Sequence, residues 1–277
     1  MRATLNGIDM EWRERGEGDA ILFIHGFPFN SAMWEPQLEH VPSGWRGIAP
    51  DLRGFGATAE GVEDVYSMEL FSRDLAALLD HLDIQQCVVC GLSMGGYIAF
   101  QFWRLFRERV RAVVLSDTRA EPDSQEGRTA RYRLAERVRA EGVHAAIEVM
   151  LPKLIASNTR LTQPGVVDHV AAMMRQTPAQ TIARALAGMA ERPDAAPILA
   201  TIDVPALVVM GADDAITGRG PVESLARGIR GARMVTIDAA GHVPNLEQPD
   251  AFNRALASFL TNLPAARRHT PTSPTRL

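Results

Sequence analysis

The chain has 277 residues, a formal net charge of −4, 46% hydrophobic residues and 22% charged residues. These values are typical of a soluble globular protein, and an α/β fold of this length is commonly a single domain. The acidic balance, with no basic run in the body of the sequence, argues against a nucleic-acid partner. No apolar run approaches the roughly 18 residues that a membrane span needs. The first residues also lack the apolar core of a signal peptide, so we expect no membrane partner.

Strands and helices alternate through the first part of the sequence. A hairpin is predicted over residues 4–13 around Gly7, followed by an apolar strand over 20–24 that is buried on both faces. Ser31 is predicted to cap a helix that runs to about Val41. The remaining predictions are a strand over 45–49, a helix over 68–82, a strand over 87–92, a helix over 97–106 and a strand over 110–116. This alternation predicts a mostly parallel sheet with helices on both faces.

The alternation is interrupted between residues 119 and 200, where the pattern is helical throughout. Amphipathic helices are predicted over 128–140, 143–153, 165–175 and 178–191. A strand over 204–210, a helix over 222–229, a strand over 233–237 and a helix over 249–263 then complete the α/β pattern. We therefore expect a core formed by residues 1–118 and 201–263, with a helical insertion over 119–200. Residues 264–277, rich in Thr, Pro and Ser, are predicted to be disordered.

The two cysteines, Cys87 and Cys90, fall in one predicted strand. Side chains three residues apart on a strand point to opposite faces, so these two can neither form a disulfide nor share a metal ion. Thioredoxin-type motifs place such a pair at a helix N-terminus instead. We predict two buried, reduced thiols, which favour a cytoplasmic location.

A strand-to-helix turn at Gly91-Leu92-Ser93-Met94-Gly95 carries the strongest functional signal. In this Gly-x-Ser-x-Gly arrangement the serine is expected to adopt a strained backbone conformation that lifts its hydroxyl above the sheet edge. The flanking glycines remove side chains that would collide across the turn. The pattern predicts that Ser93 is a nucleophile. An idle serine in a glycine-lined turn is the alternative.

A serine nucleophile needs a base, and that base needs an orienting acid. His242 lies on a glycine-preceded loop after the last predicted strand, and we predict that it is the base. His40, His81, His144, His169 and His269 are expected to be solvated, and His25 to hold its own loop. Asp214, after the strand over 204–210, gives the chain order Ser–Asp–His that this turn requires. Asp117, which ends the strand over 110–116, and Asp213 remain open as alternative acids.

The negative charge that develops during acyl transfer needs preorganised donors. The backbone N–H groups of Met94 and Phe27 are predicted to supply them, because Met94 follows the nucleophile and Phe27 follows Gly26 in the loop after the first buried strand. No metal or organic cofactor is implied by this chemistry.

From about Leu5 to Leu263 the chain resembles the α/β-hydrolase superfamily. The resemblance rests on the nucleophile turn, on Gly211-x-x-Asp214 and Gly241-His242, and on the segments His25-Gly26-Phe27-Pro28 and Asp51-Leu52-Arg53-Gly54-Phe55-Gly56. It implies that Asp51 and Arg53 shape a loop and that residues 119–200 form a helical cap over the site. Within the superfamily, the chain is most similar to small cofactor-free esterases and the 3-oxoadipate enol-lactonase group.

The resemblance implies hydrolysis of a small carboxylic ester or lactone through an acyl-enzyme. Carbon–carbon bond hydrolases, perhydrolases and ligand receptors that keep the same triad are the alternatives. Epoxide hydrolases and haloalkane dehalogenases place an aspartate at the nucleophile position, so Ser93 argues against both classes.

Side chains of the expected cap could line the pocket or simply join the cap to the core. They are Met150, Leu151, Met173, Met174 and Met189. The cap residues expected on a solvated face are Arg131, Arg133, Glu136, Arg137 and Glu141, although an inward arginine could hold a substrate carboxylate. Phe29 and Trp34 suggest an apolar wall.

Overall fold

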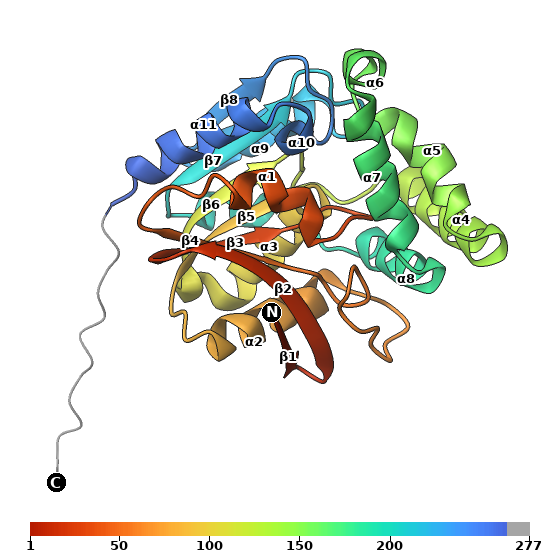
Figure 1. The fold of residues 1–277 in the computed structure, drawn as a ribbon, viewed down its shortest axis with the longest axis horizontal. Helices are drawn as coiled ribbons and strands as arrows, with labels where there is room; N and C mark the ends of the chain where they lie inside the picture. Colours follow the sequence, from red (N-terminus) through yellow and green to blue (C-terminus); the bar gives the residue numbers. More distant parts are fainter. Residues whose placement is uncertain (265–277) are drawn as a thin grey trace, which may run out of the picture.

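The computed structural model describes residues 1–264 and consists of one eight-stranded sheet with helices packed around it (Figure 1). The strand order is β1-β2-β4-β3-β5-β6-β7-β8. The first two pairings, β1 with β2 and β2 with β4, are antiparallel, and all later pairings are parallel. The strands are β1 (Arg2–Leu5), β2 (Ile8–Gly16), β3 (Asp19–Ile24), β4 (Trp45–Pro50), β5 (Cys87–Leu92), β6 (Val110–Ser116), β7 (Ala206–Gly211) and β8 (Arg233–Ile237). The predicted mostly parallel α/β sheet is therefore confirmed.

The helices follow the predicted order with a few differences. They are α1 (Glu35–Leu38), α2 (Met68–His81), α3 (Met94–Phe106), α4 (Gln125–Glu141), α5 (His144–Leu154), α6 (Ser157–Thr162), α7 (Pro164–Gln176), α8 (Ala179–Ala190), α9 (Arg219–Gly228), α10 (Pro244–Glu247) and α11 (Pro249–Thr261), with 3₁₀ turns η1 (Ser31–Trp34), η2 (Arg107–Arg109) and η3 (Ala196–Thr201). The short helices α6 and α10 were not predicted. Helix α3 begins at Met94, directly after the serine, rather than at Tyr97.

The predicted helix from Ser31 to Val41 is wrong in its start and its length. Asn30 is the N-cap, and its side chain accepts a hydrogen bond from the Ala32 N–H. The segment then forms a 3₁₀ turn followed by one turn of α-helix, with Pro36 near the start of α1. Proline has no N–H to donate to the preceding turn, which explains why a continuous helix does not form.

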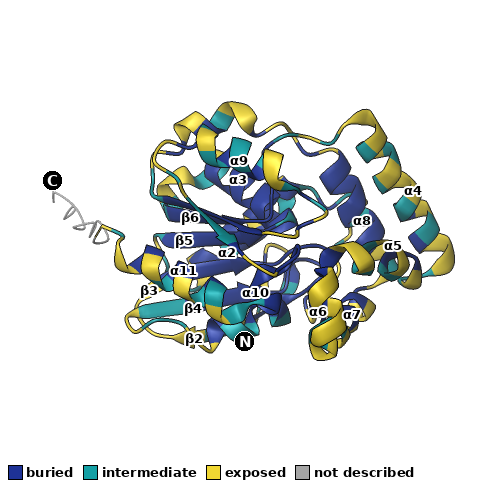
Figure 2. Ribbon diagram, turned by 90° about the horizontal axis from the view of Figure 1, so that it is seen from above, coloured by how far each residue is buried: buried dark blue, intermediate teal, exposed yellow. Residues whose placement is uncertain are grey.

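Side chains of the central strands alternate between two apolar layers. In β3, Leu22 and Ile24 belong to the layer formed with α2, α3 and α9, whereas Ile21 and Phe23 belong to the layer formed with η1, α1 and α11. Figure 2 shows β5 and β6 buried along their length, as a sheet covered on both faces requires. The sheet is thus a rigid support whose carboxyl edge carries the loops described below.

Cys87 and Cys90 confirm the strand alternation, because they contact opposite apolar layers. Both are free and buried. Burial raises the pKa of the Cys87 thiol to about 12 and raises that of Cys90 further. Neither is therefore a reactive thiolate. A cytoplasmic location stays a prediction.

Five helices, α4 to α8, occupy the chain between β6 and β7, and this segment of the described structure contains no strand (Figure 1). Helix α4 packs against α8, and its outer face is exposed (Figure 2). Both ends of the segment are tied together, since the Ala195 N–H donates to the Ala120 carbonyl over 2.9 Å. Arg192, near the last helix, bonds to Asp123 near the first at 2.9 Å. Disorder was predicted for residues 264–277, and all of these except Pro264 lie outside the described residues.

No helix among the described residues is both long and apolar enough to cross a membrane.

Candidate active site

Ser93 lies between the carboxyl end of β5 and the first residue of α3. Its backbone has φ 55° and ψ −111°, a left-handed conformation that non-glycine residues rarely adopt. The neighbouring loop holds it in place, because the Ser93 N–H donates to the Ser116 carbonyl at 2.9 Å and the Thr118 hydroxyl donates to the Ser93 carbonyl at 2.8 Å. The strained turn expected from the sequence is therefore present.

The glycines around Ser93 are required by close backbone contacts. A Cβ on Gly91 would lie 2.3 Å from the Gly95 carbonyl oxygen, and one on Gly95 would lie 2.2 Å from the Ile24 carbonyl oxygen. Real Cβ contacts are essentially never shorter than 3.0 Å. The two glycines thus let α3 begin directly against β3 and β5, which places Ser93 at the N-terminal end of a helix.

His242 and Asp214 form a buried pair at the same edge of the sheet. Asp214 follows β7 and His242 follows β8, and the distance from His242 Nδ1 to Asp214 Oδ1 is 3.0 Å. Burial by itself would raise the pKa of Asp214, but His242 and the backbone N–H groups of Ile216 and Thr217 lower it to about 2. Because an ionised carboxylate only accepts hydrogen bonds, His242 Nδ1 carries the proton, and Nε2 is left as the basic nitrogen.

Of the two alternative acids, Asp213 is exposed, whereas Asp117 lies close to the pair. Asp117 is fully buried, and one side-chain atom each of Asp117, Asp214 and His242 lie within 4.8 Å of one another. The structure therefore pairs Asp214 directly with the histidine and places Asp117 behind it. The catalytic roles of these residues stay predictions.

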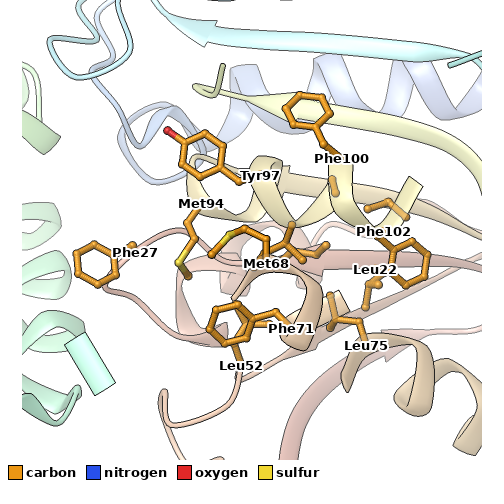
Figure 3. Close-up of a cluster of buried hydrophobic side chains, with 14 of the residues drawn as sticks. Leu22, Phe27, Leu52, Met68, Phe71, Leu75, Met94, Tyr97, Phe100 and Phe102 are labelled. Atoms are coloured by element: carbon orange, nitrogen blue, oxygen red, sulfur yellow. The ribbon is translucent and has the colours of Figure 1, made fainter. Parts of the chain in front are cut away.

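The two residues predicted to supply backbone donors lie on different segments: Met94 is the first residue of α3, and Phe27 is in the loop after β3. The Phe27 and Met94 side chains belong to one buried apolar cluster (Figure 3). Within residues 1–264, neither backbone N–H donates to another backbone group in a turn, loop or cap. Their role as donors to a substrate oxygen stays a prediction. His25 holds this loop as predicted, since its Nε2 accepts from the Leu52 N–H at 3.1 Å and its Nδ1 lies 2.9 Å from the Gly26 carbonyl oxygen. Burial lowers the pKa of His25 to about 4, so its ring is neutral.

Asp51 and Arg53 shape a loop, as the resemblance implied. The Asp51 carboxylate accepts from the Ser31 N–H at 2.7 Å and from the Ala57 N–H at 2.8 Å. Arg53 is buried and binds the Asp74 carboxylate through two hydrogen bonds of 2.9 and 2.6 Å. These contacts fix the loop after β4 against the loop after β3 and involve no exposed reactive group.

Most of the remaining histidines have the ordinary environment that we predicted. His40, His81, His144 and His169 are exposed, and His269 lies outside the described residues.

Phe29 and Trp34, expected to form an apolar wall of the pocket, are not at a pocket surface. Both are fully buried, and Trp34 stacks between Phe23 and Phe252 with ring centroids 5.0 and 5.9 Å apart. They belong to the core.

The residues of the helical segment divide between core and surface. Met173, Met174 and Met189 are buried in the two apolar layers, and Met150 and Leu151 are half-buried against them. Arg133, Glu136 and Glu141 are exposed as predicted. Arg131 is not on a solvated face: it turns inward and forms an ion pair with Asp123. It shares the Asp123 carboxylate with Arg192, so both guanidinium groups are engaged within the protein.

Sequence reasoning missed Glu247, a buried carboxylate beneath the histidine loop. Its Oε1 accepts from the Gly241 N–H at 2.8 Å and the Val243 N–H at 3.4 Å, and its Oε2 accepts from the Ala156 N–H at 2.9 Å. Gly241 is not in a left-handed conformation. It is needed because a Cβ there would lie 2.6 Å from the Ala156 nitrogen.

A polar groove of about 860 Å³ lies between β2, η1 and α7. Asn30, Ser31, His169 and Met173 are among its lining residues. Its lining does not include Ser93, Asp214 or His242, so the groove lies beside the candidate site rather than in it.

Comparison with known proteins places the geometry in a family. A family model described as the alpha/beta hydrolase fold matches residues 19–249. The chain is 29% identical to 3-oxoadipate enol-lactonase 2 of Acinetobacter baylyi, over 93% of this chain and 95% of that protein. It resembles the solved structure of a malate-bound thermophilic esterase from Thermogutta terrifontis, with a TM-score of 0.91, 39% identity and coverage of 95% and 98%. It also resembles the enol-lactonase of Burkholderia xenovorans LB400, with a TM-score of 0.88, 29% identity and coverage of 94% and 100%.

Proposed function

The chain belongs to the alpha/beta hydrolase family, and on that premise we propose that it is a serine hydrolase that cleaves a small carboxylic ester or lactone. The observation that carries the proposal is the buried His242–Asp214 pair, which follows β7 and β8 at the same edge of the sheet as a strained serine after β5. Relatives described as an enol-lactonase and an esterase support the same class of carbonyl chemistry.

In the proposed reaction, Ser93 Oγ attacks the substrate carbonyl carbon while His242 Nε2 takes the hydroxyl proton. Asp214 stabilises the imidazolium through the 3.0 Å contact to Nδ1. Collapse of the tetrahedral intermediate expels the alcohol, which receives the proton from His242 and leaves an acyl group on Ser93. Water then attacks the acyl-enzyme with the same histidine as base, which releases the acid and restores the serine.

The Phe27 and Met94 N–H groups are proposed to bind the oxyanion of both tetrahedral intermediates. Met94 is the first residue of α3, where backbone N–H groups have no partner within the helix. The positive end of the helix dipole adds to their effect. Removing one donor of this kind typically costs about 3–4 kcal/mol of transition-state stabilisation.

Residues 119–200 are proposed to act as a cap over this site, with residues 1–118 and 201–263 as the catalytic core. The support is a direct contact between the two: the His242 N–H donates to the Leu154 carbonyl at 3.0 Å. The end of α5 therefore touches the loop that carries the proposed base.

A panel of aryl esters, lactones and β-diketones tests the proposal. We expect steady turnover of at least one ester or lactone, and a loss of more than about 10³-fold in kcat for Ser93→Ala. Glu39→Gln, at an exposed position on another part of the molecule, is the matched control and should be unchanged. Turnover confined to β-diketones would contradict ester hydrolysis and indicate carbon–carbon bond cleavage. A single burst without turnover would contradict it as well and indicate a receptor function.

A further inference from the structure

Asp117 is a second buried carboxyl group at the proposed site, and the mechanism above does not use it. It follows β6 directly and has no exposed surface. Its backbone is in the left-handed region, with φ 46°, which costs energy at a non-glycine residue. Its Oδ1 accepts from the Gly211 N–H at 2.8 Å, and its Oδ2 accepts from the Ser116 hydroxyl at 2.7 Å. The carboxyl group is therefore held in one orientation.

That orientation brings Asp117 against Asp214. The two oxygens of Asp214 have different surroundings: Oδ1 accepts from His242, Ile216 and Thr217, whereas Oδ2 is buried without a hydrogen-bond donor within residues 1–264. An unpartnered carboxylate oxygen in a protein interior is costly. The side chain of Asp117 can supply the missing donor if it carries a proton.

We propose that Asp117 is a positioning residue: its carboxyl group is protonated on Oδ2 and donates a hydrogen bond to Asp214 Oδ2. The proposal rests on the proposed function of Asp214 as the orienting acid. Oδ1 cannot carry the proton, because it faces the Gly211 N–H. Oδ2 can accept from the Ser116 hydroxyl and donate to Asp214 at the same time.

The electrostatics of the pair agree with this arrangement. Burial raises the pKa of Asp117 well above its usual range, and the neighbouring Asp214 raises it further. The pKa of Asp214 is lowered to about 2, so the pair holds one proton and one negative charge. Asp214 and His242 are the titratable groups that face Asp117, while its contacts at Ser116, Gly211 and Thr217 are uncharged.

A hydrogen bond from Asp117 would fix the orientation of the Asp214 carboxylate. With Oδ2 anchored by Asp117 and Oδ1 held by two backbone N–H groups, the Asp214 carboxylate cannot rotate away from His242. The site also keeps a single negative charge beside the imidazole, which stabilises the imidazolium without a second carboxylate.

The test compares Asp117→Asn with Asp117→Ala. Asparagine keeps an oxygen for the Gly211 N–H and presents an amide donor to Asp214, so it reproduces the proposed arrangement. We expect Asp117→Asn to retain kcat within about threefold and Asp117→Ala to lose about 10- to 100-fold in kcat with little change in KM, as a lost hydrogen bond to a charged group implies. Asp213→Asn, at the exposed neighbour of Asp214, is the matched control.

The pH profile of kcat/KM separates positioning from a merely structural role. We expect Asp117→Asn to leave the midpoint of the acidic limb within about 0.3 pH units of the wild type, because no charge is lost. If Asp117 were ionised, its replacement would remove a negative charge about 5 Å from His242 and move that midpoint down by more than about one pH unit. Such a shift, or full activity in Asp117→Ala, would overturn the proposal.

A readout without substrate distinguishes this proposal from the proposed function. In the folded wild type Asp117 holds a proton that the unfolded chain releases. The unfolding equilibrium constant of the wild type, relative to Asp117→Asn, should therefore rise about tenfold per pH unit between pH 5 and 7. A constant ratio would overturn the protonated state of Asp117, even if no ester or lactone were turned over.

Discussion

Replacing Glu247 by glutamine tests whether the histidine loop and the cap are held by one buried carboxylate. Glu247 is 1% exposed, and its two oxygens accept three backbone N–H groups. In the variant, one oxygen can still accept from Gly241 and Val243. The other becomes an amide that faces the Ala156 N–H and cannot accept from it.

The expected loss can be worked from these contacts. A hydrogen bond to a charged group contributes about 1.5–3 kcal/mol, and an unpartnered buried N–H costs about 1–3 kcal/mol. Burial raises the pKa of Glu247, so the neutral amide recovers part of the desolvation penalty of the carboxylate. We expect Glu247→Gln to lower the free energy of unfolding by about 2–3 kcal/mol. We also expect it to lower kcat about tenfold, because the histidine loop loses its link to Ala156 and keeps only the weaker bonds from Gly241 and Val243 to a neutral amide oxygen.

Urea denaturation followed by circular dichroism measures the first quantity, and turnover of an aryl ester measures the second. Glu39→Gln makes the same chemical change at an exposed glutamate and should stay within about 0.5 kcal/mol of the wild type. A Glu247→Gln protein as stable and as active as this control would refute the role of Glu247.

The remaining predictions concern the acids and the loop after β4. Asp214→Asn should lower kcat by about 10²- to 10⁴-fold in steady-state kinetics, because an amide leaves His242 in the wrong tautomer. In the wild type the raised pKa of Asp117 makes folding take up a proton, so this group lowers the free energy of unfolding by about 1.4 kcal/mol per pH unit as the pH rises above the unfolded value of 3.8. Asp117→Asn should reduce the pH slope by that amount in urea titrations at pH 5 and 7, while Glu247 and Asp74, whose pKa values burial also raises, keep their own contributions. Asp74→Ala should cost about 3–5 kcal/mol in the same assay, because it removes the buried carboxylate that binds Arg53 and leaves only the longer contacts to Glu63 and the Asn6 carbonyl.

The strands and the longer helices could be predicted because their signals are local. The strands of the parallel sheet are apolar runs between glycines, prolines and charged residues, and β6 has the predicted bounds of 110–116. The short helices α6 and α10 span six and four residues, too few to show a helical period. The prediction of one helix after Asn30 was wrong for a related reason, because Pro36 divides the segment into two single turns.

The sequence could predict those site residues whose order along the chain and whose spacing the chemistry requires. A serine in this turn requires a histidine and an acid after later strands, and Asp214 and His242 do lie together. Asp117 could be named as an alternative acid because it ends a strand, but its contacts could not be derived from the sequence, and Glu247 was missed altogether. Glu247 contacts Ala156 across 91 residues of sequence, and Asp117 contacts Gly211 across 94. Such contacts depend on the packing of loops, which leaves no periodic signal in the sequence.

The proposed covalent chemistry at Ser93 is the central claim, and covalent labelling tests it most directly. A fluorophosphonate reacts with an activated serine and stays attached, so intact-mass analysis and peptide mapping identify the nucleophile. We expect one equivalent of label on the peptide that contains Ser93, about 10²-fold slower labelling in Asp214→Asn, and no label in Ser93→Ala. Label on another residue, or equal labelling of Ser93→Ala, would contradict the account.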